Sequence, residues 1–293
     1  MRGTSPGLEQ VTPRVFRGFQ AMILRESGIN LSETKRALLV GRLGRRLREL
    51  GLDSFEEYLG RVEASADERV LMLDAIATNE TRFFREPGQF EFLKERVLPA
   101  WLEEGSRRRR PHRVRIWSAG CSTGEEPFSL AMLLASYLPK TWDLEILATD
   151  LSTKALARAR AGVWPLERSR EIPPDLLKAY MLRGTGPEDG KMKAGPELRA
   201  LVRFERINLA GDNWPPDGPF DAILCRNVLI YFDADGKRRA VSRLLDRLAP
   251  GGFFFVGHAE TLNGITDRVR PLMPSAYTNG EALPRGSRSG AGR

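Results

Sequence analysis

A carboxylate and a turn of small residues are the first candidates for chemistry in this sequence. Residues 118–129 read Ser-Ala-Gly-Cys-Ser-Thr-Gly-Glu-Glu-Pro-Phe-Ser and follow the apolar segment 114–117. A turn of this kind at the start of a helix presents backbone amides to a polar or anionic ligand. Asp150 ends the next apolar segment. In nucleotide-binding α/β folds, a carboxylate at this position accepts hydrogen bonds from the two hydroxyls of a ribose. The pattern predicts a nucleoside site, and the competing interpretation is a structural turn with Asp150 as a helix cap.

The turn differs from the common phosphate-binding motifs. It is not the G-x-G-x-x-G of a dinucleotide enzyme, and no Gly-Lys-Ser/Thr follows it. Arg226 and Asn227 come directly after a further apolar segment, 220–225. Because the carboxyl ends of parallel strands meet at one edge of a sheet, we expect Arg226 and Asn227 to lie near Asp150.

The elements that must position these residues divide the chain into a helical part and a part of alternating strands and helices. The apolar spacing predicts a helical domain over residues 14–76 and an interdomain segment over 77–112. A parallel α/β domain is expected over 113–273. Residues 166–201 are rich in Pro and Gly and break its rhythm, so they are expected to form an inserted subdomain. A tail at 279–293 is expected to be disordered.

One predicted helix carries a row of basic residues next to its buried face. Leu39, Leu43, Leu47 and Leu50 form the apolar stripe. Four cations fall on the adjoining arc and define the basic ridge: Lys35, Arg42, Arg45 and Arg46. The ridge is either a contact for an acidic partner or a solvated helix face.

Composition limits the classes of protein. The 293 residues include 46 Lys and Arg against 38 Asp and Glu, a net charge of +8, which suits an acidic partner without choosing between nucleic acid and protein. Only two Cys and two His occur, so we expect a cytoplasmic protein without a metal site. Neither a signal peptide nor a membrane span is predicted.

Several motifs in one order resemble the CheR family of chemotaxis receptor methyltransferases. The matching segments are 78–85 (Thr-Asn-Glu-Thr-Arg-Phe-Phe-Arg), 118–129, 148–150, 208–209, 220–233 and 248–260. The resemblance covers roughly residues 15–262. It implies an all-α N-terminal domain and a Rossmann-like S-adenosylmethionine-dependent methyltransferase domain with a small inserted β subdomain. It also implies methyl transfer to glutamate carboxylates on the cytoplasmic domain of methyl-accepting chemoreceptors, by an enzyme that we expect to be a monomer.

The resemblance also implies roles for individual residues. Arg85 and Tyr231 would lie at the reacting groups, with Tyr231 near the methyl group. The basic ridge would bind the receptor. The cofactor contacts implied are Asn79, Thr81, Arg85, Glu125, Asp150, Asn208, Leu209, Arg226 and Asn227.

Two other functions stay open at the level of sequence. A methyltransferase acting on nucleic acid or a small molecule would also suit the positive charge, although the D/N-P-P-Y/F motif of amino-methylating nucleic-acid enzymes is absent. A signalling module that binds S-adenosylmethionine without turnover is the second alternative.

Overall fold

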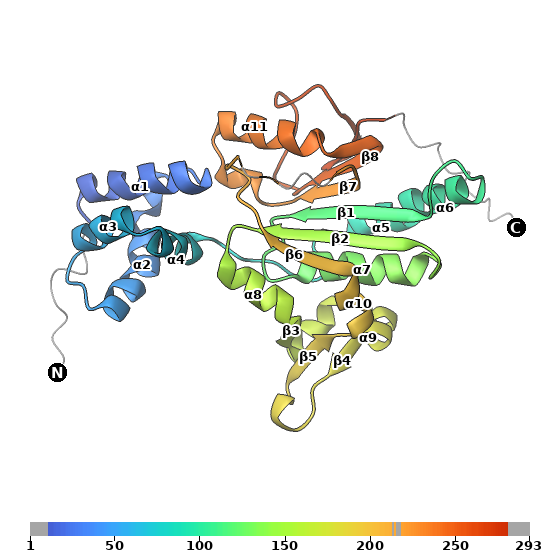
Figure 1. Cartoon of the computed structure of the whole chain (residues 1–293), viewed down its shortest axis with the longest axis horizontal. Coiled ribbons are helices and arrows are strands. Elements are labelled where there is room, and N and C mark those ends of the chain that lie inside the picture. The colour runs from blue at the N-terminus through green and yellow to red at the C-terminus, as the bar shows by residue number, and fades with distance from the viewer. Residues whose placement is uncertain (1–10, 213, 215–217, 281–293) are drawn as a thin grey trace, which may run out of the picture.

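The computed structural model describes residues 11–212, 214 and 218–280, so the tail expected at 279–293 lies almost entirely outside the described residues. The N-terminal domain is all-α, and Figure 1 shows it on the side of the main sheet where β1 and β2 end. Its elements are α1 (Pro13–Ser27), η2 (Glu33–Lys35), α2 (Arg36–Leu50), α3 (Phe55–Ala64) and α4 (Ala66–Ile76). Among the described residues, no helix combines the length and apolar character needed to cross a bilayer.

Local signals in the sequence account for these helix ends. The side chain of Thr12 accepts a hydrogen bond from the Val15 N–H at the start of α1, and Ser54 caps α3 in the same way. Gly51 ends α2 in the left-handed conformation, with φ 66°. The predicted apolar stripe of α2 faces inward, with Leu39, Leu43 and Leu47 fully buried.

The second domain is built on a seven-stranded sheet in the order β6-β2-β1-β7-β8-β10-β9. The five strands from β6 to β8 are mutually parallel, and β10 and β9 add antiparallel pairs at one edge. This confirms the expected Rossmann-like class. The strands are β1 (Arg113–Ala119), β2 (Asp143–Asp150), β6 (Val202–Arg206), β7 (Phe220–Cys225), β8 (Leu248–Val256), β9 (Arg270–Met273) and β10 (Ala276–Thr278).

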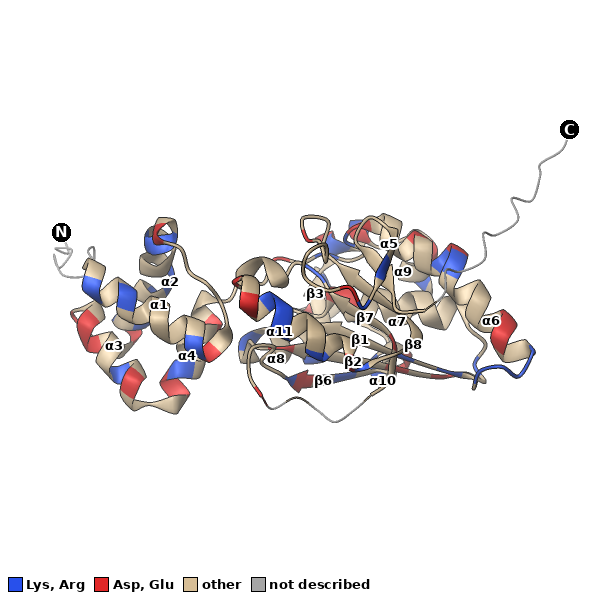
Figure 2. Cartoon of the chain, turned by 90° about the horizontal axis from the view of Figure 1, so that it is seen from above, with Lys and Arg blue, Asp and Glu red and all other residues tan. Residues whose placement is uncertain are grey.

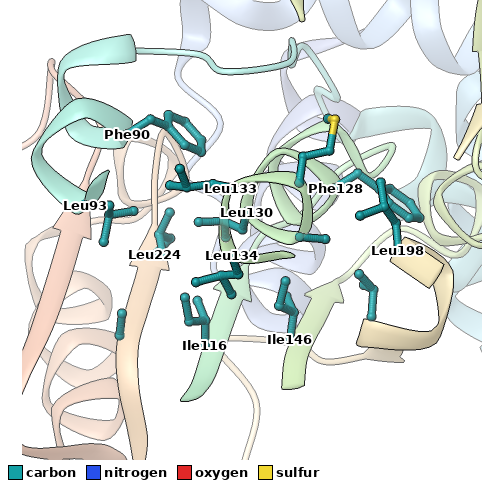
Figure 3. Close-up of a cluster of buried hydrophobic side chains, with 14 of the residues drawn as sticks. Phe90, Leu93, Ile116, Phe128, Leu130, Leu133, Leu134, Ile146, Leu198 and Leu224 are labelled. Atoms are coloured by element: carbon teal, nitrogen blue, oxygen red, sulfur yellow. The ribbon is translucent and has the colours of Figure 1, made fainter. Parts of the chain in front are cut away.

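Helices cover both faces of this sheet. One hydrophobic cluster includes Ile116 and Ile146, and Figure 3 shows it beneath the helices of that face. Their neighbours Trp117 and Leu147 point the other way, into a cluster with α11 (Ala234–Leu245), as the alternation of a strand requires. The helical segments of the first cluster are α5 (Pro87–Phe92), η3 (Leu93–Val97), α6 (Leu98–Ser106), α7 (Glu125–Tyr137), α8 (Thr153–Ala161) and α10 (Pro196–Leu201).

The insertion forms a separate three-stranded antiparallel sheet in the order β3-β5-β4. Its elements are β3 (Val163–Pro165), η4 (Leu166–Glu171), α9 (Pro174–Tyr180), β4 (Met181–Arg183), η5 (Gly186–Glu188) and β5 (Lys191–Ala194). The small sheet therefore begins at Val163, ahead of residue 166, because β3 pairs with β5. Trp164 anchors it by packing edge-on against Phe128 of α7, with ring centroids 5.2 Å apart.

The main sheet continues beyond the expected domain end at residue 273. β10 lies between β8 and β9, and its Ala276 pairs with Phe255. No sequence signal for this strand stood out, because it has only three residues.

The two domains meet at the turn after α1. The Asn30 N–H donates to the Tyr231 carbonyl over 2.7 Å, and Ile29 forms a β-bridge with Phe232. Gly28 sits in this contact with φ 72°, and a Cβ built there would lie 2.6 Å from the Cβ of Ala210. Close packing of the domains therefore requires glycine at this position.

Substituting Gly28 with Ala is expected to destabilise the protein and to weaken ligand binding between the domains. The left-handed backbone costs about 1–2 kcal/mol for an L-residue, and the overlap with Ala210 adds to it. Gly51→Ala is a matched control, because Gly51 has φ 66° and an added Cβ would meet only open space there. Urea unfolding should show a larger decrease in the free energy of unfolding for Gly28→Ala than for Gly51→Ala. Equal losses would argue against a tight domain contact.

Candidate active site

A pocket of about 350 Å³ opens at the edge where β1, β2, β6 and β7 end, between the two domains. This volume lies in the range of ligand sites in proteins. The sheet domain contributes Gly120, Ser122, Glu126, Asp150, Leu151, Ile207, Asn208, Leu209, Arg226, Asn227, Val228, Ile230, Tyr231 and Phe232. The N-terminal domain and the linker contribute Ser27, Ile29, Asn30, Leu31, Lys35, Leu38, Ile76, Ala77, Thr78, Asn79, Glu80, Thr81 and Arg85.

The small-residue turn after β1 forms one wall of the pocket. The N–H groups of Gly120 and Cys121 both donate to the Thr149 carbonyl, over 2.7 and 2.8 Å, and tie the turn to β2. Gly120 has φ 94°, and a Cβ built there would lie 2.3 Å from Cγ2 of Val228. The close approach of the two loops depends on this glycine.

Asp150 lies at the end of β2 and is held by backbone amides. Its Oδ2 accepts from the Ser122 N–H over 2.8 Å, and its Oδ1 accepts from the Ser152 N–H over 2.9 Å. Burial raises the pKa of Asp150 above its ordinary value, although both N–H groups oppose the shift. Each carboxylate oxygen retains a further lone pair, so the group remains able to accept from ligand hydroxyls.

Arg226 forms a buried ion cluster with two carboxylates at the pocket. One of its Nη atoms lies 3.1 Å from Oε2 of Glu86, and the other lies 3.0 Å from Oε2 of Glu126. Burial raises the pKa of Glu126, with Arg226 opposing the shift. Burial acts on Glu86 in the same direction, but the His258 N–H and Arg226 outweigh it, and the pKa of Glu86 is lowered. Arg226 is thus the cation that favours the charged forms of both buried carboxylates against the effect of burial.

The linker between the domains closes another side of the pocket. Asn79, Thr81 and Arg85, three of the cofactor contacts implied by the resemblance, all line it. The Asn79 carbonyl accepts from the Ser122 hydroxyl over 3.1 Å, and Arg85 donates to the Glu80 carbonyl over 3.0 Å. The linker is therefore hydrogen-bonded, through Asn79, to the turn after β1.

The strands β6 and β7 lead to the remaining predicted residues. Asn208 and Leu209 line the pocket, and the Asn208 amide also donates to the Glu26 carbonyl over 2.6 Å. Asn227 and Tyr231 line it from the segment after β7. The pocket thus brings together eight of the nine predicted cofactor residues, and Tyr231 as well.

Glu125 is the ninth, and it does not line the pocket. It is 2% exposed, accepts from the Thr123 hydroxyl over 2.7 Å and lies 3.4 Å from Arg168. Burial raises the pKa of Glu125. Its neighbour Glu126 takes the place at the pocket wall, because the first turn of α7 rotates consecutive side chains to different directions. The resemblance implied Glu125 as the cofactor contact and did not point to Glu126, which is the member of the pair that lines the pocket.

The four residues of the basic ridge make different contacts. Arg46 forms a two-pronged salt bridge with Glu68, at 2.8 Å for each bond, and Arg42 donates to the Ile76 carbonyl and to Thr78. Lys35 lines the pocket, and the Arg45 side chain is 78% exposed beside Glu49. Figure 2 shows acidic and basic positions intermixed along the helices of the N-terminal domain. The ridge is therefore not a continuous free cationic surface.

Two family models cover nearly the whole chain. The description "CheR methyltransferase, SAM binding domain" matches residues 79–277, and "CheR methyltransferase, all-alpha domain" matches residues 14–77. The chain belongs to the CheR family. It is an S-adenosylmethionine-dependent methyltransferase, in agreement with the predicted cofactor and the predicted enzyme class.

Curated members of the CheR family are similar over almost their whole length. "Chemotaxis protein methyltransferase 2" of Pseudomonas aeruginosa is 42% identical over 265 residues, which is 90% of this chain and 92% of the relative. The chemotaxis protein methyltransferase of Salmonella typhimurium is 38% identical, over 90% of this chain and 91% of the relative. That of Escherichia coli is 37% identical, with 91% and 93% covered.

The residues of the pocket fit the methyl donor of the CheR family. S-adenosylmethionine carries a sulfonium, an ammonium, a carboxylate and two ribose hydroxyls. The pocket offers carboxylates on Asp150 and Glu126 and a guanidinium on Arg85. The buried Nε of Arg226 has no hydrogen-bond partner among the described residues. The pocket therefore presents groups of both charges to a ligand that carries both.

Proposed function

We propose that this protein transfers the methyl group of S-adenosylmethionine to glutamate side-chain carboxylates of chemoreceptors and forms glutamyl methyl esters. The observation that carries the proposal is the pocket at the strand ends, with Asp150 held by two amides and Lys35 at the wall on the helical domain. We further propose that the protein acts as a monomer in the cytoplasm, where the receptor regions to be methylated lie.

We assign the pocket residues to parts of the donor. Asp150 would accept from the ribose hydroxyls, and Asn208 with Leu209 would border the adenine. Arg85, with Asn79 and Thr81, would pair with the donor carboxylate. Glu126 at the wall would favour the cationic groups of the donor, and the buried Glu125, which does not line the pocket, would act on them from a greater distance. Arg226 and Asn227 would form the floor, and Tyr231 would lie beside the reacting carbon.

In this reaction the pocket residues would align the glutamate carboxylate with the methyl group and would not need to transfer a proton. When bound, S-adenosylmethionine supplies a methyl group on a good leaving group. A glutamate with a pKa of about 4.3 is already ionised at neutral pH, so the protein needs no general base. Holding the carboxylate in line and excluding water can contribute roughly 7–11 kcal/mol. The docked helical domain, through Lys35 and Leu38, would exclude water from one side.

The test is the formation of base-labile methyl esters. Purified protein is incubated with S-adenosylmethionine labelled on the methyl group and with receptor cytoplasmic fragments, and volatile methanol released by alkali is counted. Alkali-released label on receptor glutamates is the expected result. Label on tRNA, DNA or a small molecule instead would support another methyltransferase. Donor binding without transfer to any receptor would support a signalling module.

Arg45 is expected to contribute to receptor binding because its side chain is 78% exposed. Arg45→Glu should raise the KM for receptor roughly threefold to tenfold at low salt, with less effect at high salt and none on donor affinity. Arg107→Glu serves as a control of equal charge change, since Arg107 follows α6 and does not line the pocket. An equal response of both variants would show a general charge effect.

A further inference from the structure

Glu260 lies in the turn after β8, outside the pocket, and it accepts three backbone hydrogen bonds. Its Oε2 accepts from the Asn227 N–H over 2.8 Å and from the Gly257 N–H over 2.6 Å. Its Oε1 accepts from the Ile230 N–H over 3.1 Å. Hydrogen bonds to a charged acceptor are stronger than those between neutral groups. One carboxylate thus holds two points of the segment that follows β7.

That segment lines the pocket with an irregular backbone. Asn227 has φ 58°, a conformation that L-residues rarely adopt, and the 3-10 turn η6 (Leu229–Tyr231) follows. Asn227, Ile230 and Tyr231 all line the pocket. A short segment of this shape has no strand or long helix to fix it, so side-chain acceptors must supply the missing partners of its N–H groups.

The turn after β8 is shaped to reach this segment. A Cβ built on Gly257 would lie 2.3 Å from Nδ2 of Asn227 and 2.9 Å from its backbone nitrogen. The backbone at Gly257 therefore approaches Asn227 more closely than any other residue type would allow. The His258 N–H donates to Oε1 of Glu86 over 3.0 Å, which joins the same turn to the Arg226 cluster.

Resting on the proposed function, we propose that Glu260 is a positioning residue for methyl transfer: it fixes the Ile230–Tyr231 turn against the pocket without touching the reactants. Glu86 holds the side chains of Arg226 and Asn227 independently. Asp150 ends β2, and Asn208 lies in the loop that follows β6. Loosening the Glu260 contact therefore acts on turnover more than on donor affinity.

The variant Glu260→Gln separates these two quantities. A Gln amide has one acceptor oxygen, so it can keep the two bonds made by Oε2 but presents N–H donors to the Ile230 N–H. We expect kcat with receptor fragments to fall roughly tenfold, with the Kd of S-adenosylmethionine changed less than about threefold. Amides 227–230 should exchange hydrogen faster, with the rest of the domain unchanged. Glu103→Gln on α6 is the matched control.

A second variant covers the case in which Glu260→Gln does not fold. Glu260→Asp keeps the charge and shortens the reach, so its kcat should lie between those of the wild type and Glu260→Gln. Wild-type kcat in both variants would overturn the proposal, as would a loss of donor affinity parallel to the loss of kcat. The wild type is assayed beside them, because its own failure to methylate receptors would reject the proposed function rather than the role of Glu260.

Discussion

Replacing Arg226 with Met is expected to lower the free energy of unfolding by about 3–5 kcal/mol, the range for breaking a buried ion pair from one side. Arg226 is 6% exposed and lies between Glu86 and Glu126. Its loss leaves two buried carboxylates without a cation. Urea unfolding at neutral pH measures the effect. Arg113→Met is the control, since Arg113 pairs with Asp143 and Glu145 at the surface, where a pair contributes at most about 1 kcal/mol.

The stability of the Arg226→Met variant should also depend on pH in a defined direction. Without the cation, the pKa values of Glu86 and Glu126 should rise above those of the unfolded chain, because burial already favours their neutral forms. A folded state with raised pKa values binds more protons, so its stability increases as the pH falls through those values. The deficit relative to the wild type should therefore shrink as the pH falls from neutral through the raised pKa values. A deficit that stays constant would contradict the ion cluster.

Replacing Asp150 with Ala is expected to weaken the binding of S-adenosylmethionine by about 1–3 kcal/mol, or roughly fivefold to 150-fold. The change removes the proposed acceptor of the ribose hydroxyls. It also leaves the N–H groups of Ser122 and Ser152 without their partner, which loosens the turn after β1. Isothermal titration calorimetry with S-adenosylmethionine measures the loss.

Asp143 provides a matched control for Asp150. It lies at the opposite end of β2 and is an exposed partner of Arg113, so Asp143→Ala should leave donor affinity unchanged. Donor affinity of the wild type should also fall as the pH falls through the raised pKa of Asp150, because the protonated group is a weaker acceptor for a hydroxyl. This contribution to the pH dependence should be absent from Asp150→Ala. Wild-type affinity in Asp150→Ala would remove the ribose assignment.

Many elements of the fold and the site followed from local patterns. The Leu stripe of α2 was predicted, because it depends on short-range periodicity. The grouping of Asp150, Asn208 and Arg226 was also predictable, since parallel strands must end at one edge. The strand β10 was not, because a segment of three residues has too little pattern to be distinguished from a loop.

The sequence by itself determined the order of the elements, the family and the strand ends that carry the polar residues of the pocket, because these depend on local propensity and on motifs that are contiguous in the chain. Only the tertiary structure decided which partner each charged side chain takes. Arg226 meets Glu86 from 140 residues away, Arg46 turns to Glu68, and Glu126 rather than Glu125 reaches the pocket. Such pairings depend on the phase of each helix and on packing between distant segments, which no local pattern encodes.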